Sequence, residues 1–142
     1  MITAQQILNK KGNKNYSIDV DATVIDALKI MADKNIGALL VTEKDVFKGI
    51  FTERDYSRKI ALEGKSSSDT KVGDVLSTHH PKIDPKAIVE ECMLLMSDNN
   101  VRYLPVFENG NLVGIISISD VVNTIIDYQK ETISHLKNYM GL

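Results

Sequence analysis

Two serines and an aspartate lie at the end of the apolar stretch GIISISD, residues 114–120, and their types and spacing suit two kinds of chemistry. A hydroxyl followed three positions later by a carboxylate, as in Ser117 and Asp120, is the pattern that caps the start of a helix. The free N–H groups and partial positive charge of a helix N-terminus also favour a phosphate. A carboxylate can accept both hydroxyls of a vicinal diol, so capping and ligand binding are both open for these residues.

A second stretch of the chain carries nearly the same pattern. In GIFTERD, residues 49–55, Thr52 and Asp55 take the places of the serine and the aspartate, while Arg54 stands where the other stretch has the second hydroxyl, Ser119. We expect one explanation to serve both stretches. Helix capping alone is sufficient for the first of them, and Arg54 changes the group that is offered to a phosphate.

The two stretches belong to an internal repeat with an offset of 65 residues. When residues 17–60 are placed over residues 82–125 without a gap, 14 of the 44 pairs are identical. About 3 identical pairs would be expected by chance for such a composition. Most of the identical residues are apolar or belong to turns, as a shared fold requires.

Each copy has the hydrophobic pattern of a β-α-β-β-α unit, so we expect an α+β fold. An apolar stripe at helical spacing follows a short extended segment in each copy, formed by Val24, Ala27, Leu28 and Met31 or by Val89, Cys92, Met93 and Met96. Two apolar runs come next, and Asn109-Gly110 between the runs of the second copy predicts a β-hairpin. A second helix begins near Glu53 or Ile118. One copy is too small to bury its own core, so the copies must pack as one pseudo-symmetric module.

The repeat sets the expected domain boundaries. A short helix leads into each copy, at residues 3–8 and at residues 71–76, and GKSSSDTK has the composition of a linker. The expected segments are domain 1 at residues 1–63 with its lead-in helix, a linker at 64–71, domain 2 at 72–127 and a C-terminal helix extension at 128–142.

The extension carries an apolar stripe that outlasts the repeat. The stripe comprises Val122, Ile125, Ile126, Gln129, Ile133, Leu136 and Met140. The equivalent helix of the first copy ends near residues 61–64, so the extra turns must pack on something outside the pseudo-symmetric core. A second chain is the expected partner, which predicts a homodimer. The alternative that the tail folds back on its own module stays open.

Composition excludes several classes of protein. With 17 basic and 19 acidic side chains, the net charge of -2 gives no general attraction for nucleic acid. No run approaches the ~18 apolar residues of a membrane span, and the first residues lack the apolar core of a secretory signal. These features predict a cytoplasmic protein that binds neither nucleic acid nor membrane.

No constellation for catalysis is recognisable in the sequence. Cys92 lies in an apolar helix stripe without a spaced base, so we expect it to pack in the core rather than to act as a nucleophile. The adjacent His79 and His80 cannot easily face one ion, and no partner follows at ligand spacing. A phosphate-binding glycine loop is missing as well. We therefore expect no catalytic residue, no metal site and no enzyme activity.

The repeated motifs resemble those of a tandem pair of cystathionine β-synthase (CBS) domains, which is called a Bateman module. The resemblance covers nearly all of the chain and is carried by VGDVL at 72–76, HHPKIDPKAIVEECMLLMSDNNVRYLPV at 79–106 and NGNLVGIISISDVV at 109–122. It implies a sensor that binds adenosine-containing ligands in clefts between the paired copies, without catalysis. It also implies association as flat dimers.

The resemblance also implies the ligand contacts. In the family, the aspartate of a motif resembling G-x-x-[ST]-x-[ST]-D holds ribose and the hydroxyls assist with phosphate. Ser117, Ser119 and Asp120 match this motif fully, whereas Thr52, Arg54 and Asp55 match it in part. The family lines the base pocket with the entry segment and the start of the second strand. These positions are Lys82, Ile83, Val101, Arg102, Tyr103, Leu104 and Pro105 in the second copy, and Tyr16, Ile18, Gly37 and Ala38 in the first.

The second copy has the better equipped of the two expected sites, because Arg102 adds a charge where the first copy has Gly37. The leading hypothesis is a stand-alone sensor of AMP, ADP or ATP whose change in packing is read by an unknown effector protein. NAD or S-adenosylmethionine are alternative ligands. A second hypothesis is a ligand-free structural dimerisation module, in which the serines and aspartates only cap helices.

Overall fold

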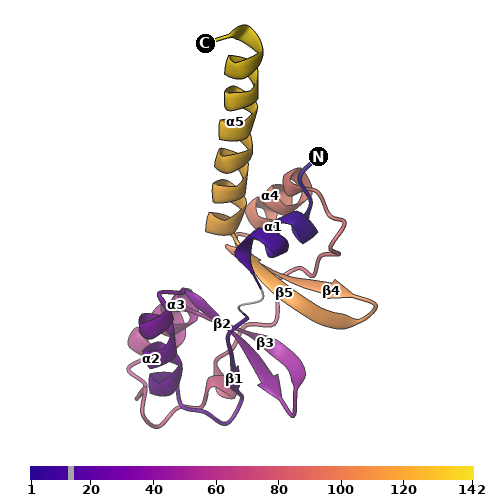
Figure 1. Cartoon of the computed structure of the whole chain (residues 1–142). Helices are drawn as coiled ribbons and strands as arrows, with labels where there is room; N and C mark the ends of the chain where they lie inside the picture. Colours follow the sequence, from indigo (N-terminus) through magenta and orange to yellow (C-terminus); the bar gives the residue numbers. More distant parts are fainter. Residues whose placement is uncertain (13–14) are drawn as a thin grey trace. The chain divides into compact units, whose positions relative to one another are not determined.

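The computed structural model describes residues 1–12 and 15–142, which form two compact units (Figure 1). One unit is Asn15–His80, and the other combines the described residues up to Gly12 with Pro81–Leu142. Each unit pairs helices with a small β-sheet, so the expected α+β fold is confirmed.

The first unit contains the first copy of the repeat. Its elements are β1 (Ser17–Asp19), α2 (Val24–Lys34), β2 (Ala38–Glu43), β3 (Val46–Thr52), α3 (Glu53–Asp55), the π-helix η1 (Tyr56–Ala61) and the 3-10 turn η2 (Val72–Asp74). Strand β2 pairs in parallel with β1 and antiparallel with β3. The side chain of Thr23 caps the start of α2, and Asn35 ends that helix in the left-handed conformation, with φ of 53°.

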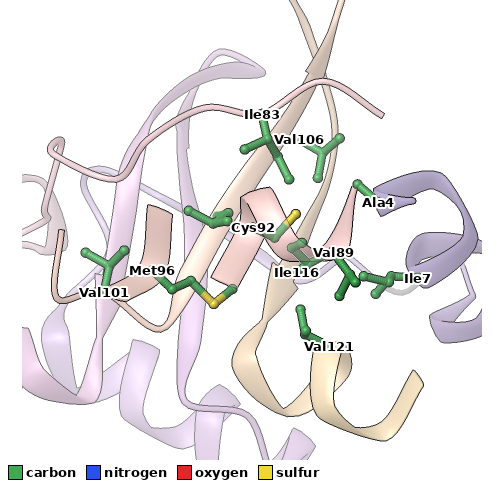
Figure 2. Packing of buried hydrophobic residues seen from close by; sticks show 11 residues of the cluster. Ala4, Ile7, Ile83, Val89, Cys92, Met96, Val101, Val106, Ile116 and Val121 are labelled. Atoms are coloured by element: carbon green, nitrogen blue, oxygen red, sulfur yellow. The ribbon is translucent and has the colours of Figure 1, made fainter. Parts of the chain in front are cut away.

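The second unit contains the second copy. Its elements are α1 (Ala4–Lys11), α4 (Val89–Asp98), β4 (Tyr103–Glu108), β5 (Asn111–Ser117) and α5 (Ile118–Met140). Figure 2 shows its core, where Cys92 and Met96 of α4 lie among apolar side chains from the strands and from α1. Cys92 is fully buried, and burial raises the pKa of its thiol, so its expected role in core packing is confirmed.

The two copies differ in their first strand. In the first copy, the amide of Leu40 donates to Tyr16 and the amide of Val20 donates to Thr42. The repeat places Pro105 and Pro85 at the positions of Leu40 and Val20, and a proline has no amide hydrogen to donate. Only an isolated bridge therefore remains in the second copy, between Ile83 and Val106, so that the sheet of this unit is the β4–β5 hairpin.

Both hairpins turn through two residues with positive φ. The predicted turn of the second copy is confirmed at Asn109 and Gly110, with φ of 52° and 80°. Lys44 and Asp45 adopt the same type of turn in the first copy, with φ of 51° and 65°. Sequence alone gave this first hairpin the weaker signal, because lysine and aspartate tolerate the left-handed region less well than Asn-Gly does.

Each lead-in segment, meaning the short helix or turn that precedes a copy in the chain, packs into the core of the other copy. The sequence groups the N-terminal helix with domain 1, but Ala4 and Ile7 of α1 are buried in the core of the second copy. The segment before the second copy packs into the first, where Val72 and Val75 are buried. The compact units therefore divide the chain differently from the expected boundaries, because each lead-in buries its apolar residues in the core of the other copy.

Helix α5 extends well beyond the core of its unit (Figure 1). Its first turns bury Val121, whereas every residue from Ile126 to Leu142 is exposed. The described helices, α5 included, lack the long apolar stretch that a bilayer crossing requires.

Candidate functional site

The predicted capping pattern is formed at the start of α5. The Ser117 hydroxyl accepts a hydrogen bond from the Asp120 amide at 3.0 Å, and the Asp120 carboxylate accepts one from the Ser117 amide at 2.8 Å. The helix begins here because its first free N–H groups find these oxygen partners. Ser119 lies in the same first turn and is exposed.

Asp120 also accepts a charged hydrogen bond from α1. The ammonium of Lys11 lies 2.9 Å from Asp120 Oδ2 and 2.8 Å from the carbonyl oxygen of Ile115. Both contacts to Asp120, from Ser117 and from Lys11, use Oδ2, and no described residue donates to Oδ1. The Asp120 side chain is 23% exposed, so this carboxylate has an oxygen available for a further donor.

The equivalent pattern caps α3 in the first copy. Asp55 Oδ2 accepts hydrogen bonds from the Thr52 amide at 2.9 Å and from the Thr52 hydroxyl at 3.0 Å. The Thr52 hydroxyl in turn accepts one from the Asp55 amide at 3.1 Å. Both residues are buried, unlike Ser117 and Asp120, which are only partly buried.

Two further side chains engage the other oxygen of Asp55. The Ser77 hydroxyl donates to Oδ1 at 2.5 Å, and the Lys59 ammonium lies 3.0 Å from the same atom. Lys59 also donates to the Ser77 hydroxyl at 3.3 Å and to the carbonyl oxygens of Val75 and Leu76. Asp55, Ser77 and Lys59 thus form a closed network of hydrogen bonds in which each contacts the other two.

The remaining candidates of the second copy follow the pseudo-symmetric pattern. Ile83, Val101, Leu104 and Pro105 are buried, whereas Lys82, Arg102 and Tyr103 retain exposed surface. The carbonyl oxygen of Arg102 accepts a hydrogen bond from the Ile118 amide at 2.9 Å, which brings the start of β4 next to the start of α5. The Lys82 ammonium lies 4.5 Å from the centre of the Phe107 ring, a cation–π contact.

The first-copy candidates are arranged in the same way around α3. The carbonyl oxygen of Gly37 accepts a hydrogen bond from the Glu53 amide at 3.1 Å, as Arg102 does from Ile118. Ile18 and Ala38 are buried, Tyr16 and Arg54 are partly exposed, and Arg54 has further contacts of its own. In both copies, therefore, the start of the second strand lies beside the capped helix.

His80 adds an unexpected buried nitrogen to the first unit. Burial, together with the charge of the neighbouring His79, lowers the pKa of its imidazole to about 4, while Asp55 opposes the shift. The two rings are stacked with centres 4.8 Å apart, and His80 Nδ1 has no hydrogen-bond partner in the described part of the chain. Across the described residues, no group of three or more potential metal ligands occurs.

Sequence reasoning missed Lys11 and Ser77 as neighbours of the two aspartates. Lys59 was recognised as a positive charge near the site, and it lies four residues after Asp55 on a predicted helix. Lys11 and Ser77 carry no such signal, since they come from the lead-in segments and lie 109 and 22 residues away along the chain. Finding them requires knowledge of which copy each lead-in packs against.

A comparison with known families finds the CBS domain twice in the chain, at residues 6–62 and 72–127. The mitochondrial CBS domain-containing protein CBSX3 of Arabidopsis thaliana is 41% identical over 125 residues, which are 84% of this chain and 61% of that protein. The chain therefore spans less than two thirds of this relative. The CBS domain-containing protein YhcV of Bacillus subtilis is 31% identical over 105 residues, which are 74% of this chain and 74% of that protein.

Solved structures agree with the sequence relatives. A CBS-domain protein from Burkholderia ambifaria superimposes with a TM-score of 0.84 and 41% identity, over 88% of this chain and 94% of that one. A hexameric CBS-CP12 protein from bloom-forming cyanobacteria gives a TM-score of 0.73 and 26% identity, over 99% of this chain and 88% of that one. From the two matched segments and these relatives we conclude that the chain belongs to the CBS domain family and carries two copies of the domain in tandem.

Proposed function

We propose that this CBS pair senses an adenine nucleotide, AMP, ADP or ATP, and binds its ribose through Asp120. Binding then shifts the packing of the copies or the assembly of chains, and an effector protein reads the change. No catalytic step is part of this function.

The observation that carries the proposal is the state of the Asp120 carboxylate. This group is partly exposed, and Oδ1 receives no hydrogen bond from a described residue. An ionised carboxylate forms strong hydrogen bonds with vicinal hydroxyls, and the adjoining first turn of α5 supplies Ser117 and Ser119 for a phosphate. The side-chain chemistry of this helix start therefore suits a nucleoside phosphate.

Thermal unfolding in the presence of a ligand panel tests the function. We expect AMP, ADP or ATP to raise the melting temperature, because only the folded state binds. Once the ligand concentration exceeds the dissociation constant, the increase should grow with the logarithm of that concentration. NAD and S-adenosylmethionine complete the panel as the alternative ligands. A protein whose melting temperature is unchanged by all five compounds at millimolar concentration would not be a nucleotide sensor.

A structural dimerisation module is the second candidate function. It is favoured by the capping bonds of Ser117 and Asp120, which serve the backbone of α5 without any ligand, and by the exposed apolar face of that helix. The same panel separates the two candidates. The structural module predicts no ligand response, together with a loss of stability when the cap is removed.

Association through α5 is part of the proposal under either candidate. Val122, Ile126, Ile133, Leu136 and Met140 follow each other at intervals of three, four or seven residues and are exposed. The cyanobacterial relative described as hexameric covers nearly the whole of this chain. We propose a homodimer in which these faces meet, and a location in the cytoplasm, although the Arabidopsis relative is named as mitochondrial.

A further inference from the structure

We propose that each chain binds one nucleotide, at Asp120, and that Ser77 and Lys59 keep the equivalent aspartate of the first copy, Asp55, from binding a second. The inference rests on the proposed function and adds to it the number and identity of the sites. It comes from a difference between two residues that the repeat makes equivalent.

All acceptor positions of Asp55 are occupied within its own unit. A carboxylate offers about four lone-pair directions, two on each oxygen. Oδ2 accepts from the amide and the hydroxyl of Thr52, and Oδ1 accepts from Ser77 and Lys59. With a side chain that is only 6% exposed, Asp55 can accept a diol only after these bonds are broken.

The bonds that occupy Asp55 are held in place by contacts that do not involve Asp55. Ser77 pairs with Ile50 through two backbone hydrogen bonds, of 2.9 Å and 2.8 Å. Gly49 lies against the same segment so closely that a Cβ there would be 2.5 Å from the Ser77 carbonyl oxygen. The backbone of Ser77 is therefore held beside β3, which keeps its side chain next to the Asp55 carboxylate.

Among the described residues, donors reach one oxygen of Asp120 only, and the cationic partner Lys11 is partly exposed. Lys11 reaches Asp120 with its side chain, which has four rotatable bonds and is 24% exposed. A change of Lys11 rotamer frees one of the two acceptor directions of Oδ2 without any movement of the backbone, while the bond from the Ser117 amide stays. The ammonium released in this way is a cation beside the ribose position, where it can pair with a phosphate.

Isothermal titration calorimetry of the full chain with ATP and with AMP tests the inference. We expect a stoichiometry of one nucleotide per chain and a loss of affinity of at least tenfold in Asp120→Asn, which keeps the shape of the side chain but removes its negative charge. Asp45→Asn, in the exposed turn between β2 and β3, is the matched control and should bind as the unaltered protein does.

The outcomes separate this inference from the function on which it rests. Two nucleotides per chain would overturn the inference and leave the proposed function in place. A single nucleotide that Asp120→Asn still binds with full affinity would overturn the inference and also the role of Asp120 in that function, but not nucleotide sensing. Absence of binding to the unaltered protein would instead overturn the function itself. Thermal unfolding of each variant without ligand verifies that a loss of binding does not reflect a loss of the fold.

Discussion

The two capping aspartates illustrate how one residue type acquires two roles from its surroundings. Asp55 is buried and bonded on both oxygens, so its charge is compensated inside the protein. Asp120 is partly exposed, and the described residues bond to one of its oxygens. The first carboxylate therefore contributes mainly to stability, and the second keeps capacity for a ligand.

We expect Asp55→Asn to lower the free energy of unfolding by about 2 to 3 kcal/mol, because it leaves Lys59 and Ser77 without their charged acceptor. Asp120→Asn should cost less than about 1 kcal/mol, because asparagine still caps a helix and the lost ion pair with Lys11 is partly exposed. Urea unfolding followed by circular dichroism measures both values. Equal costs for the two variants would contradict the difference in their surroundings.

His80 makes the stability of the first unit depend on pH. Its pKa is about 4 in the folded protein and about 6.5 in the unfolded chain, so only the unfolded chain takes up this proton between those values. We expect stability to fall as the pH is lowered from 6.5 towards 4. His80→Gln, which cannot be protonated, should flatten that part of the curve in urea unfolding, and an unchanged slope would show that His80 is solvated.

The sequence identified the aspartates and hydroxyls of both helix starts, because a capping pattern lies within four consecutive residues. It could not show that Asp55 is enclosed and Asp120 is not. That difference depends on Ser77 and Lys11, which reach the site from the lead-in of the other copy.

At the scale of elements, hydrophobic period and turn chemistry predicted most of the fold. The helix α2, the hairpin β4–β5 and the start of α5 lie where their patterns place them. The sequence pattern predicted a first strand in the second copy as in the first, but the structure has only an isolated bridge there. The prolines responsible, Pro85 and Pro105, are visible in the sequence. Their effect appears only when the copies are aligned, because each proline removes a ladder bond that the first copy makes.

Contact between β3 and the lead-in segment yields a prediction at this scale. Gly49→Ala places a Cβ 2.5 Å from the Ser77 carbonyl oxygen and 2.6 Å from a methyl carbon of Leu76. We expect the free energy of unfolding to fall by about 1 to 3 kcal/mol, as is usual for overpacking. Lys48→Ala, exposed on the same strand, is the control in a urea titration. A Gly49→Ala protein as stable as the control would contradict the close contact of Leu76 and Ser77 with β3.

At the scale of the molecule, the segment that precedes each copy in the chain packs into the core of the other copy. The core of each unit is completed by a segment that comes from before the other copy, such as Ile7 of α1 or Val72 of η2. Neither copy, cut at the boundaries of the repeat, contains its whole core. Family patterns predict the pair, but only the structure shows which segment belongs to which core.

Helix α5 carries a prediction for the assembly. Removing residues 128–142 deletes the exposed apolar positions Ile133, Leu136 and Met140. We expect the full chain to elute from size-exclusion chromatography as a dimer and the shortened chain to elute with a smaller mass, with light scattering as the measure. A shortened chain of unchanged oligomeric state would place the interface elsewhere.

A crystal structure of the protein with AMP would show whether the carboxylate of Asp120 holds the ribose of an adenine nucleotide. We expect both ribose hydroxyls to lie within hydrogen-bond distance of the Asp120 oxygens, with Lys11 turned away from Oδ2. A ribose bound elsewhere, with the contact between Lys11 and Asp120 intact, would contradict this expectation.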